Sequence, residues 1–220
     1  MSTTTLAGLL LIVVPLTFNG AFAALASRFD YPDVLRHPTS EVLARFRAGG
    51  NALVLLWWGF ALTAVAMVPL VVLLSSALAD ADATLVSLAT WVGVIAALVQ
   101  FLGLVRWPFL VPYLAQVEAD EQVVDIVFQA FHRYLGVAVG EHLGYLFTGA
   151  WTTLAGVALV QSAAVPGWLG VVGIAIGPVL AACSLEFVGR GWKPAEKLTP
   201  IAYIAWSLWL VATGVALIVT

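Results

Sequence analysis

The sequence predicts an all-α, polytopic membrane protein with six transmembrane helices, and three observations lead to that fold class. Of the 220 residues, 62% are hydrophobic and only 10% are charged, whereas a soluble domain has roughly 25% charged residues. Six apolar runs reach the about 20 residues that a helix needs to cross a hydrocarbon core about 30 Å thick. All basic residues fall in or next to the connections on one side of the predicted membrane helices. The length fits one domain, so we expect residues 1–220 to form a single six-helix transmembrane domain.

The apolar runs set the expected helix boundaries. The six membrane helices are placed near residues 5–27, 51–78, 85–106, 133–161, 166–188 and 199–219. The first run is longer than the apolar core of a secretory signal and no positive segment precedes it, so we expect a retained helix. No repeat relates the first three helices to the last three, so the inverted-repeat pattern of many transporters is not indicated.

The distribution of basic residues predicts the orientation. They all lie between the first and second, third and fourth, or fifth and sixth helices, and they are Arg28, Arg36, Arg45, Arg47, Arg106, Arg133, Arg190, Lys193 and Lys197. The positive-inside rule makes that side cytoplasmic. Both the N-terminus and the C-terminus are therefore expected outside, with the chain in a bacterial cytoplasmic (inner) membrane.

Two loops on the basic side are expected to contain short amphipathic helices. After the prolines Pro32 and Pro38, a helix starts near Thr39, carries an apolar face, and ends at Gly49 and Gly50. That face consists of Val42, Leu43 and Phe46, and we expect it in the plane of the lipid head groups. A second helix starts near Glu121 and continues into the fourth membrane helix. Its polar face, formed by Asp125, Gln129 and His132, is interpreted as solvated.

The fourth membrane helix carries Glu141 and His142 side by side within an apolar span. A charged side chain there costs a few kcal/mol on insertion scales, so it indicates a function or a buried partner. Helical spacing predicts one polar face comprising Tyr134, Ala138, Glu141, Tyr145, Thr148 and Thr152. Gly136, Gly140 and Gly144 recur every four residues, a glycine-zipper spacing that lets another helix approach closely. The fourth helix is therefore expected at the centre of the bundle.

The remaining polar residues of the membrane helices gather in the half next to the basic loops. We predict a site there, with Glu141 as acid or base and with His142 and Tyr145 orienting or sharing its proton. Residues at a suitable depth to bind a ligand beside them are Asn19, Gln100, Arg106, Trp107, Thr148 and Tyr203. Polar groups confined to one half favour a pocket over a continuous pore.

Three functions are compatible with these residues. The first is a pocket, open toward the cytoplasmic leaflet, that binds or acts on a lipophilic small molecule. The second is a proton-coupled transporter of a small solute with Glu141 as the proton carrier. The third is a structural or regulatory partner protein whose glycine stripe packs against a helix of another protein. Whether the chain is an enzyme is left open.

Each site residue also has a structural interpretation. Glu141 can be neutralised by protonation or by Arg106 on the neighbouring helix, as one member of a buried pair. His142 can be a hydrogen-bonded core histidine. Trp107 can be an aromatic anchor at the membrane interface.

Composition limits the ligands and partners. The net charge is −3 and there is no basic tract, so nucleic-acid binding is not expected. The three histidines, His37, His132 and His142, lack the spacing of metal ligands, so we predict no metal site; the cofactor is unknown. The single cysteine, Cys183, excludes an internal disulfide. Membrane lipids are the expected partners, with a lipophilic small molecule and a homo-oligomer both compatible with the sequence.

Three segments resemble a known family. They are YPDVLRHP followed by EVLARFRAGG, then LVRWPFLVPYLA, and then FQAFHRYLGVAVGEHLGYLFTGAWT. They are similar to the bacterial multi-pass membrane family of the domain of unknown function 4386. The resemblance extends from about Arg28 to the last helix. It implies a six-helix protein of the bacterial inner membrane and brings no activity or catalytic residue to carry over.

Overall fold

The computed structural model is helical throughout the part of the chain that it describes, which is residues 2–188 and 193–220, with only the backbone for residues 193–196. Arg190, one of the basic residues used for the orientation, lies outside these residues. The elements, in order, are α1 (Thr3–Phe29), the 3₁₀ helix η1 (Asp33–Arg36), α2 (Thr39–Ala77), α3 (Ala83–Leu104), α4 (Arg106–Leu114), α5 (Glu121–Phe131), the π-helix η2 (His132–Leu143), α6 (Gly144–Gln161), α7 (Gly167–Cys183), the 3₁₀ helix η3 (Ser184–Phe187) and α8 (Lys193–Val219).

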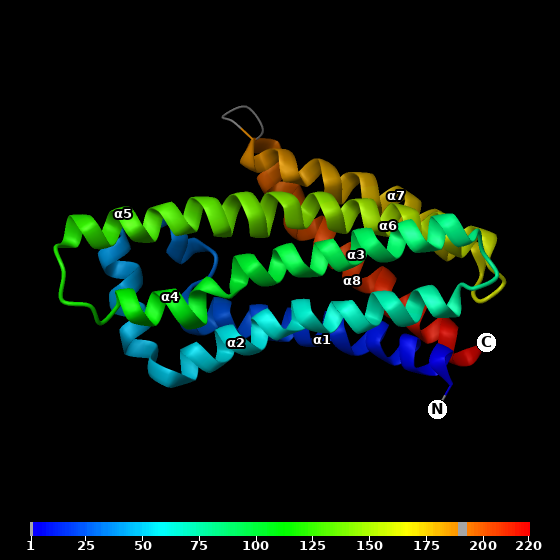
Figure 1. Cartoon of the computed structure of the whole chain (residues 1–220), viewed down its shortest axis with the longest axis horizontal. Helices are drawn as coiled ribbons and strands as arrows, with labels where there is room; N and C mark the ends of the chain where they lie inside the picture. Colours follow the sequence, from blue (N-terminus) through cyan, green and yellow to red (C-terminus); the bar gives the residue numbers. More distant parts are fainter. Residues whose placement is uncertain (1, 189–192) are drawn as a thin grey trace.

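The prediction of six membrane-spanning helices is confirmed. The described residues contain six helices that are long and apolar enough to cross a membrane: Thr3–Phe29, Thr39–Ala77, Ala83–Leu114, Glu121–Gln161, Gly167–Phe187 and Lys197–Val219. The fourth of these joins α5, η2 and α6 into one 41-residue helix that runs along the length of the molecule (Figure 1). The expected continuity from the loop helix into the fourth membrane helix is therefore present.

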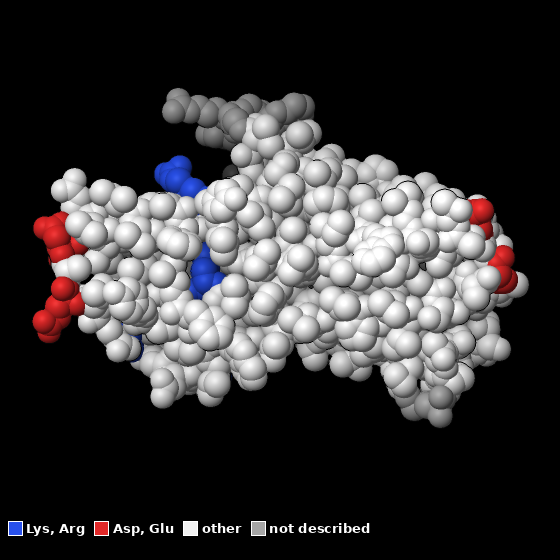
Figure 2. Space-filling view, in the orientation of Figure 1, with Lys and Arg blue, Asp and Glu red and all other residues white. Residues whose placement is uncertain are grey.

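The bundle has two ends of different character. Both chain termini lie at one end, together with the α2–α3 and α6–α7 loops, and α4 and α5 meet at the other (Figure 1). We call the two parts the terminal half and the loop half. On the face in Figure 2 the middle is uncharged, acidic side chains lie at both ends, and basic side chains lie only in the loop half.

Each half has its own core. In the terminal half Trp151 and Trp209 are buried in the larger apolar cluster. The indole nitrogens are paired there: Trp206 Nε1 donates to Thr152 Oγ1 at 2.9 Å and Trp209 Nε1 donates to the Leu169 carbonyl at 2.8 Å. These tryptophans fill the terminal half and lie in a different cluster from Trp107. The core of the loop half is a second apolar cluster, described below with the site.

The glycine stripe of the fourth helix packs inside this chain. A Cβ built on Gly140 would lie 2.7 Å from the Cα of Gly103 on α3, and one on Gly136 would lie 2.6 Å from Cζ of Arg106. A Cβ on Gly144 would meet Cγ of Gln100 at 3.0 Å. The stripe is thus occupied by α3 and its Arg106 extension. We therefore do not carry forward the hypothesis that it binds a helix of another protein.

The break predicted at the glycines is present. Gly50 adopts φ +54° and ψ −153°, which are not helical values, so α2 consists of two helical segments that meet at a kink at this residue. Glycine has no Cβ to clash at positive φ, which explains why the break falls there. The apolar face formed by Val42, Leu43 and Phe46 is buried in the core of the loop half. That burial is supplied by protein, not by lipid.

The polar face of α5 also differs from its interpretation as a solvated face. Thr39 Oγ1 donates to Asp125 Oδ1 and accepts a hydrogen bond from Gln129 Nε2 at 3.1 Å. His132 contacts Arg106 through Nδ1. Because all three polar side chains of this face bind residues of α2 or α4, the face attaches α5 to the rest of the loop half.

The predicted polar stripe is broken by η2. Its members Thr148 and Thr152, in α6, are fully buried, whereas Tyr134 is 69% exposed and Ala138 is also exposed. A π-helix hydrogen-bonds each residue to the fifth along rather than the fourth, so each turn takes more residues than in an α-helix. A face counted with α-helical spacing consequently rotates away from the core across residues 132–143.

Replacing Gly140 tests whether the α3–η2 contact limits stability. We expect Gly140→Ala to lower the free energy of unfolding by about 1–3 kcal/mol, because the added methyl group collides with the α3 backbone. Gly59 has no atom within 4 Å of the corresponding position, so Gly59→Ala should be neutral or up to about 1 kcal/mol stabilising. Unfolding titrations of the two detergent-solubilised variants make the comparison. Equal stabilities would contradict the close approach.

The two loops of the terminal end are joined through Asp80. Ser162 Oγ donates to its Oδ1 at 2.6 Å and the Ala163 backbone N–H donates to Oδ2 at 2.8 Å. These two hydrogen bonds, the Ser162 bond first, hold the pKa of Asp80 below the ordinary aspartate value. The charged form is favoured because both donors stabilise it.

The lowered pKa of Asp80 has a defined sign for stability. The contribution is present above the unfolded-state pKa of about 3.9 and is lost as the pH falls from there through the lower folded-state value. Asp80→Asn should therefore lower the Tm at pH 7 and reduce the loss of Tm between pH 5 and pH 3. Glu118 is exposed and makes no described side-chain hydrogen bond, so Glu118→Gln is the matched control. A wild-type acid response in Asp80→Asn would rule out this contribution.

Candidate functional site

Four polar side chains meet inside the loop half, and we call Tyr31, Arg106, His132 and Glu141 the polar cluster. They come from three places in the sequence: the turn before η1, the first residue of α4, and the π-helix η2. Electrostatic interactions link Tyr31 to both Glu141 and Arg106. The cluster thus joins the end of the first helix to the third and fourth.

Arg106 is buried, with only 7% of its surface exposed, and its guanidinium is held by contacts within the protein. Its Nη1 donates to the Gly103 carbonyl and its Nη2 approaches His132 Nδ1 at 3.4 Å. The guanidinium also lies 5.2 Å from the Trp107 ring centroid, a cation–π contact. A guanidinium can only donate, so Nδ1 of His132 is the acceptor and the ring is neutral with its hydrogen on Nε2.

Glu141 belongs to the polar cluster but makes no direct ionic contact with Arg106. The side chain is half-buried, and the charges acting on it are those of Arg106 first and Glu186 second. Among the described residues the structure has no ion pair between Glu141 and Arg106 within 4.0 Å. Glu141 and Arg106 therefore do not form the contacting buried pair of the structural interpretation; they attract each other only at longer range.

Tyr31 supplies a neutral hydroxyl to the cluster. Burial raises the pKa of its phenol well above the ordinary value, the Glu141 charge raises the pKa further, and the Arg106 charge acts in the opposite direction. The hydroxyl consequently stays protonated at neutral pH. It remains a hydrogen-bond donor beside a carboxylate and a guanidinium.

Arg106 packs against an aromatic cluster through the ring of Trp107. The cluster consists of Phe29, Phe46, Trp57, Trp107 and Phe128. Trp107 stacks on Trp57 with ring centroids 4.4 Å apart at 10°, and Phe29 meets it edge-on at 5.5 Å. Both tryptophans are fully buried, so the interpretation of Trp107 as an interface anchor is wrong. Within the described part of the structure neither indole Nε1 has a hydrogen-bond partner. Trp107 thus connects Arg106 to the aromatic cluster.

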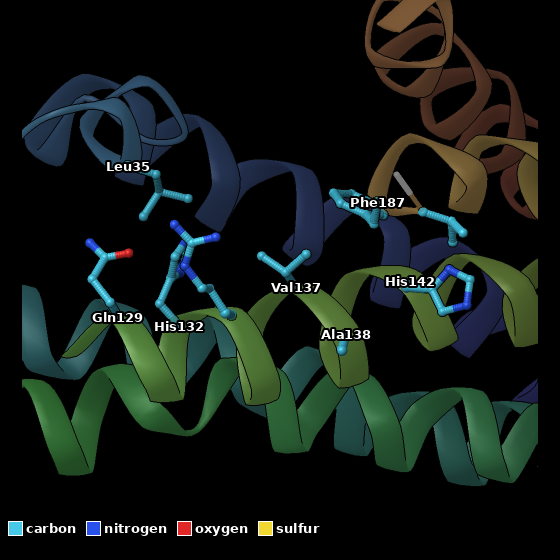
Figure 3. Close-up of a pocket in the computed structure, with 9 residues that line it drawn as sticks. Leu35, Gln129, His132, Val137, Ala138, His142 and Phe187 are labelled. Carbon is cyan, nitrogen blue, oxygen red and sulfur yellow. The ribbon is translucent and has the colours of Figure 1, made fainter. Parts of the chain in front are cut away.

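A groove of about 710 Å³ lies along η2. In Figure 3 Gln129 and His132 lie toward one end of the groove, Val137 and Ala138 lie in the middle, and His142 lies toward the other end; Leu35 and Phe187 come from separate segments facing the helix. The complete lining is Leu35, Gln129, His132, Arg133, Val137, Ala138, His142, Phe187 and Val188. We call this space the groove. Its walls are apolar in the middle and polar toward both ends.

Glu141 and His142 are adjacent in sequence, but their side chains lie in different places: Glu141 in the polar cluster and His142 in the groove. His142 lines the groove, and its Nδ1 donates to the Ser184 carbonyl at 3.0 Å. That bond places the hydrogen on Nδ1 and leaves Nε2 as the second polar atom of the ring. Glu141 does not line the groove. The interpretation of His142 as a hydrogen-bonded histidine therefore agrees with this contact.

Three of the predicted ligand residues form the layer next to the cluster. Gln100 Nε2 donates to Thr148 Oγ1 at 2.9 Å, which joins α3 to α6. Tyr203 meets Tyr145 edge-on with ring centroids 5.0 Å apart, and Tyr145 meets Phe187 at 5.4 Å. No hydrogen bond joins Tyr145 to Glu141 or His142 among the side chains that the structure describes. These residues therefore pack the helices around the cluster, and the three catalytic candidates are not connected.

Asn19 is not brought into the site. Its side chain is exposed, and its Nδ2 donates to Ser207 Oγ at 3.0 Å and to the Pro15 carbonyl at 2.7 Å. It joins α1 to α8. The expectation that Asn19 meets Glu141 was based on depth alone, and depth does not determine which face of a helix points inward.

Several residues of the site were not predicted from the sequence. Tyr31 and Trp57 belong to the polar and aromatic clusters, and Ser184 and Phe187 position and line one end of the groove. A concentration of aromatic residues at the inner ends of the first two helices is a signal for Trp57. Leu35 and Phe187 carry no sequence signal, because ordinary apolar residues become groove walls only through tertiary packing.

The geometry defines a multi-pass, all-helical membrane protein with a lateral groove and a buried polar cluster. In the part of the chain that is described, no three His, Cys, Asp or Glu residues are placed to hold a metal ion. The family model described as Domain of unknown function (DUF4386) matches residues 6–214. The chain belongs to this family, which confirms the resemblance seen in the three segments. No curated protein and no solved structure matches the chain.

A double-mutant cycle measures the attraction between Arg106 and Glu141. Arg106→Gln should lower the free energy of unfolding by about 1–3 kcal/mol, because it removes a charged donor from the buried Gly103 carbonyl. In the Glu141→Gln background we expect the loss to be smaller by about 0.5–3 kcal/mol, the range for coupled neighbours. Exposed Arg47→Gln is the control and should be neutral. Strict additivity would show that the two charges do not interact.

Proposed function

We propose that this chain is an integral protein of the cytoplasmic membrane that binds a lipophilic small molecule in the groove, from the cytoplasmic leaflet. One observation carries the proposal: a groove of about 710 Å³ that combines apolar walls with polar ends. Its volume falls within the about 300–1,000 Å³ of small-molecule sites, and such sites have mostly apolar linings with a few polar groups.

The position of the groove along the bundle supports entry from the cytoplasmic leaflet. His142 is 19 residues from Gln161, the last residue of α6, which is about 29 Å at 1.5 Å per residue. This distance is close to the thickness of a hydrocarbon core, about 30 Å. If Gln161 lies at the outer boundary, the His142 end of the groove lies at the inner boundary, and the end with Gln129, His132 and Arg133 lies beyond it on the cytoplasmic side.

The orientation rests on the basic residues. Arg28, Arg45 and Arg133 belong to the loop half, and the two loops of the terminal end contain no lysine or arginine. By the positive-inside rule the loop half faces the cytoplasm and both termini lie outside. The first part of α2, together with α5, then forms the cytoplasmic extension of the bundle.

The arrangement favours binding over catalysis. Glu141 lies outside the groove lining, and one nitrogen of His142 is committed to Ser184. A general acid or base must reach the reacting proton within about 2.6–3.2 Å. We assign the Glu141 and Arg106 charges to holding η2, α3 and the Tyr31 turn together beside the groove.

No observation favours the transporter alternative. A transporter needs polar access through both halves, whereas the buried rings of Trp151, Trp206 and Trp209 fill the terminal half, and the indole nitrogens of Trp206 and Trp209 are hydrogen-bonded. Proton-coupled flux is therefore not proposed.

Filling the groove tests the proposed binding. Ala138 lines the groove and is exposed, and Ala130 is an exposed alanine of α5 outside the lining. In protein purified from its own membrane, native mass spectrometry should find a co-purifying lipophilic molecule on the wild type and on Ala130→Phe. Ala138→Phe should lose most of it, because a phenyl ring takes up the middle of the groove.

The proposal fails if Ala138→Phe retains the same bound molecules in the same amount as the wild type. It also fails if the wild type carries none and no added lipophile changes its Tm. Because the substituted side chain is at the surface, both variants should keep the wild-type Tm without ligand, within about 0.5 kcal/mol in stability.

A further inference from the structure

We infer that the ligand of the groove carries an anionic oxygen group, a carboxylate or a phosphate, on an acyl chain, and that Arg133 binds this group together with His132 and Gln129 at the same end of the groove. This inference rests on the proposed function and specifies the chemistry of its ligand. It is carried by the polar atoms of the lining, by the charge behind it, and by the apolar walls.

The polar atoms of the lining are suited to an anion. Arg133 contributes a guanidinium, which binds carboxylate or phosphate oxygens with two parallel hydrogen bonds. His132 contributes Nε2–H, since its Nδ1 already accepts from Arg106. Gln129 adds an amide with two donor hydrogens. No described residue of the lining is acidic.

A second positive charge lies directly behind the groove. Arg106 is buried, contacts no described carboxylate, and touches the groove only through His132. The carboxylate whose charge acts on Arg106 is Glu141, and it does not line the groove. Glu186 also lies outside the lining, and it accepts a hydrogen bond from Thr199 at 3.1 Å. An anion placed beside His132 is therefore attracted by Arg133 directly and by Arg106 at longer range.

The remaining walls require an apolar body. Leu35, Val137, Phe187 and Val188 cover the rest of the groove, and a free hydrated anion would gain nothing from them. An acyl chain removes this surface from water or from disordered lipid contact. Together with the position of the His142 end at the inner boundary, these walls favour an anionic amphiphile over a soluble anion.

Matched probes separate charge from chain. Binding to the full-length protein in neutral detergent is measured by titration of the Tm and by native mass spectrometry. The probes are oleate against oleyl alcohol, dioleoylphosphatidylglycerol against dioleoylphosphatidylcholine, and inorganic phosphate alone. We expect oleate and the phosphatidylglycerol to bind about ten- to a hundredfold more tightly than their neutral counterparts, the ratio expected for charged hydrogen bonds.

Variants locate the charge effect. Arg133→Gln should reduce affinity for oleate about ten- to a hundredfold and leave oleyl alcohol unchanged. Arg133→Lys should fall between the two, because it keeps the charge and loses the planar fork. Arg47→Gln is the matched control, an exposed arginine of the loop half outside the groove, and should bind like the wild type. Arg133 is exposed, so the unliganded Tm of its variants should not change.

The outcomes distinguish this inference from the proposed function. If oleyl alcohol binds as tightly as oleate, Arg133→Gln has no effect and Ala138→Phe still blocks binding, the groove binds lipophiles but the anionic head group is wrong. If inorganic phosphate alone binds as tightly as oleate, the site is a free-anion site and the acyl chain is wrong. If no probe binds the wild type, both fail. Oleate or phosphatidylglycerol preference that disappears in Arg133→Gln supports the inference, and the two probes show which head group is preferred.

Discussion

The close approach of the fourth helix to α3 is the constraint on which the rest of the site depends. Gly140 lies against Gly103, and Arg106 crosses the space left by Gly136. A larger residue at either glycine would push η2 away and remove the position of the guanidinium. Because that position is fixed, Arg106 can reach the Gly103 carbonyl and His132 together. The glycines thus leave the space that the Arg106 guanidinium occupies.

The π-helix then divides the residues of this segment between two surroundings. Over residues 132–143 the wider turn directs Glu141 to the polar cluster and His142 to the groove, where Ser184 fixes its ring. Helices rarely contain long π segments, and those that occur are frequent at functional sites. The association of η2 with the groove lining is consistent with that tendency.

The two halves of the bundle bury their tryptophans in different ways. Buried tryptophans with paired indoles close the terminal half, while stacked Trp57 and Trp107 support Arg106 in the loop half. A charge buried without a contacting carboxylate costs free energy, and here the cost is reduced by the carbonyl of Gly103, the neutral His132 and the aromatic ring. Such an arrangement leaves the positive charge of Arg106 directly behind the groove.

Composition and hydropathy alone determined the six helices and their approximate limits, and three sequence segments, one containing Arg106 and one containing Glu141, carried the family resemblance. These are local properties, because crossing a membrane requires about 20 apolar residues whatever their partners. The sequence also indicated Gly136, Gly140 and Gly144 as a packing surface, but not its partner. Only the tertiary structure decided that this partner is α3, that Asn19 faces away, that Trp107 is core, and that Leu35 and Phe187 are walls. The π-helix is the physical reason for the largest departure: its wider turn changes the direction of the side chains between His132 and Leu143, so counting with α-helical spacing placed Tyr134 on the inward polar face, whereas its side chain is exposed.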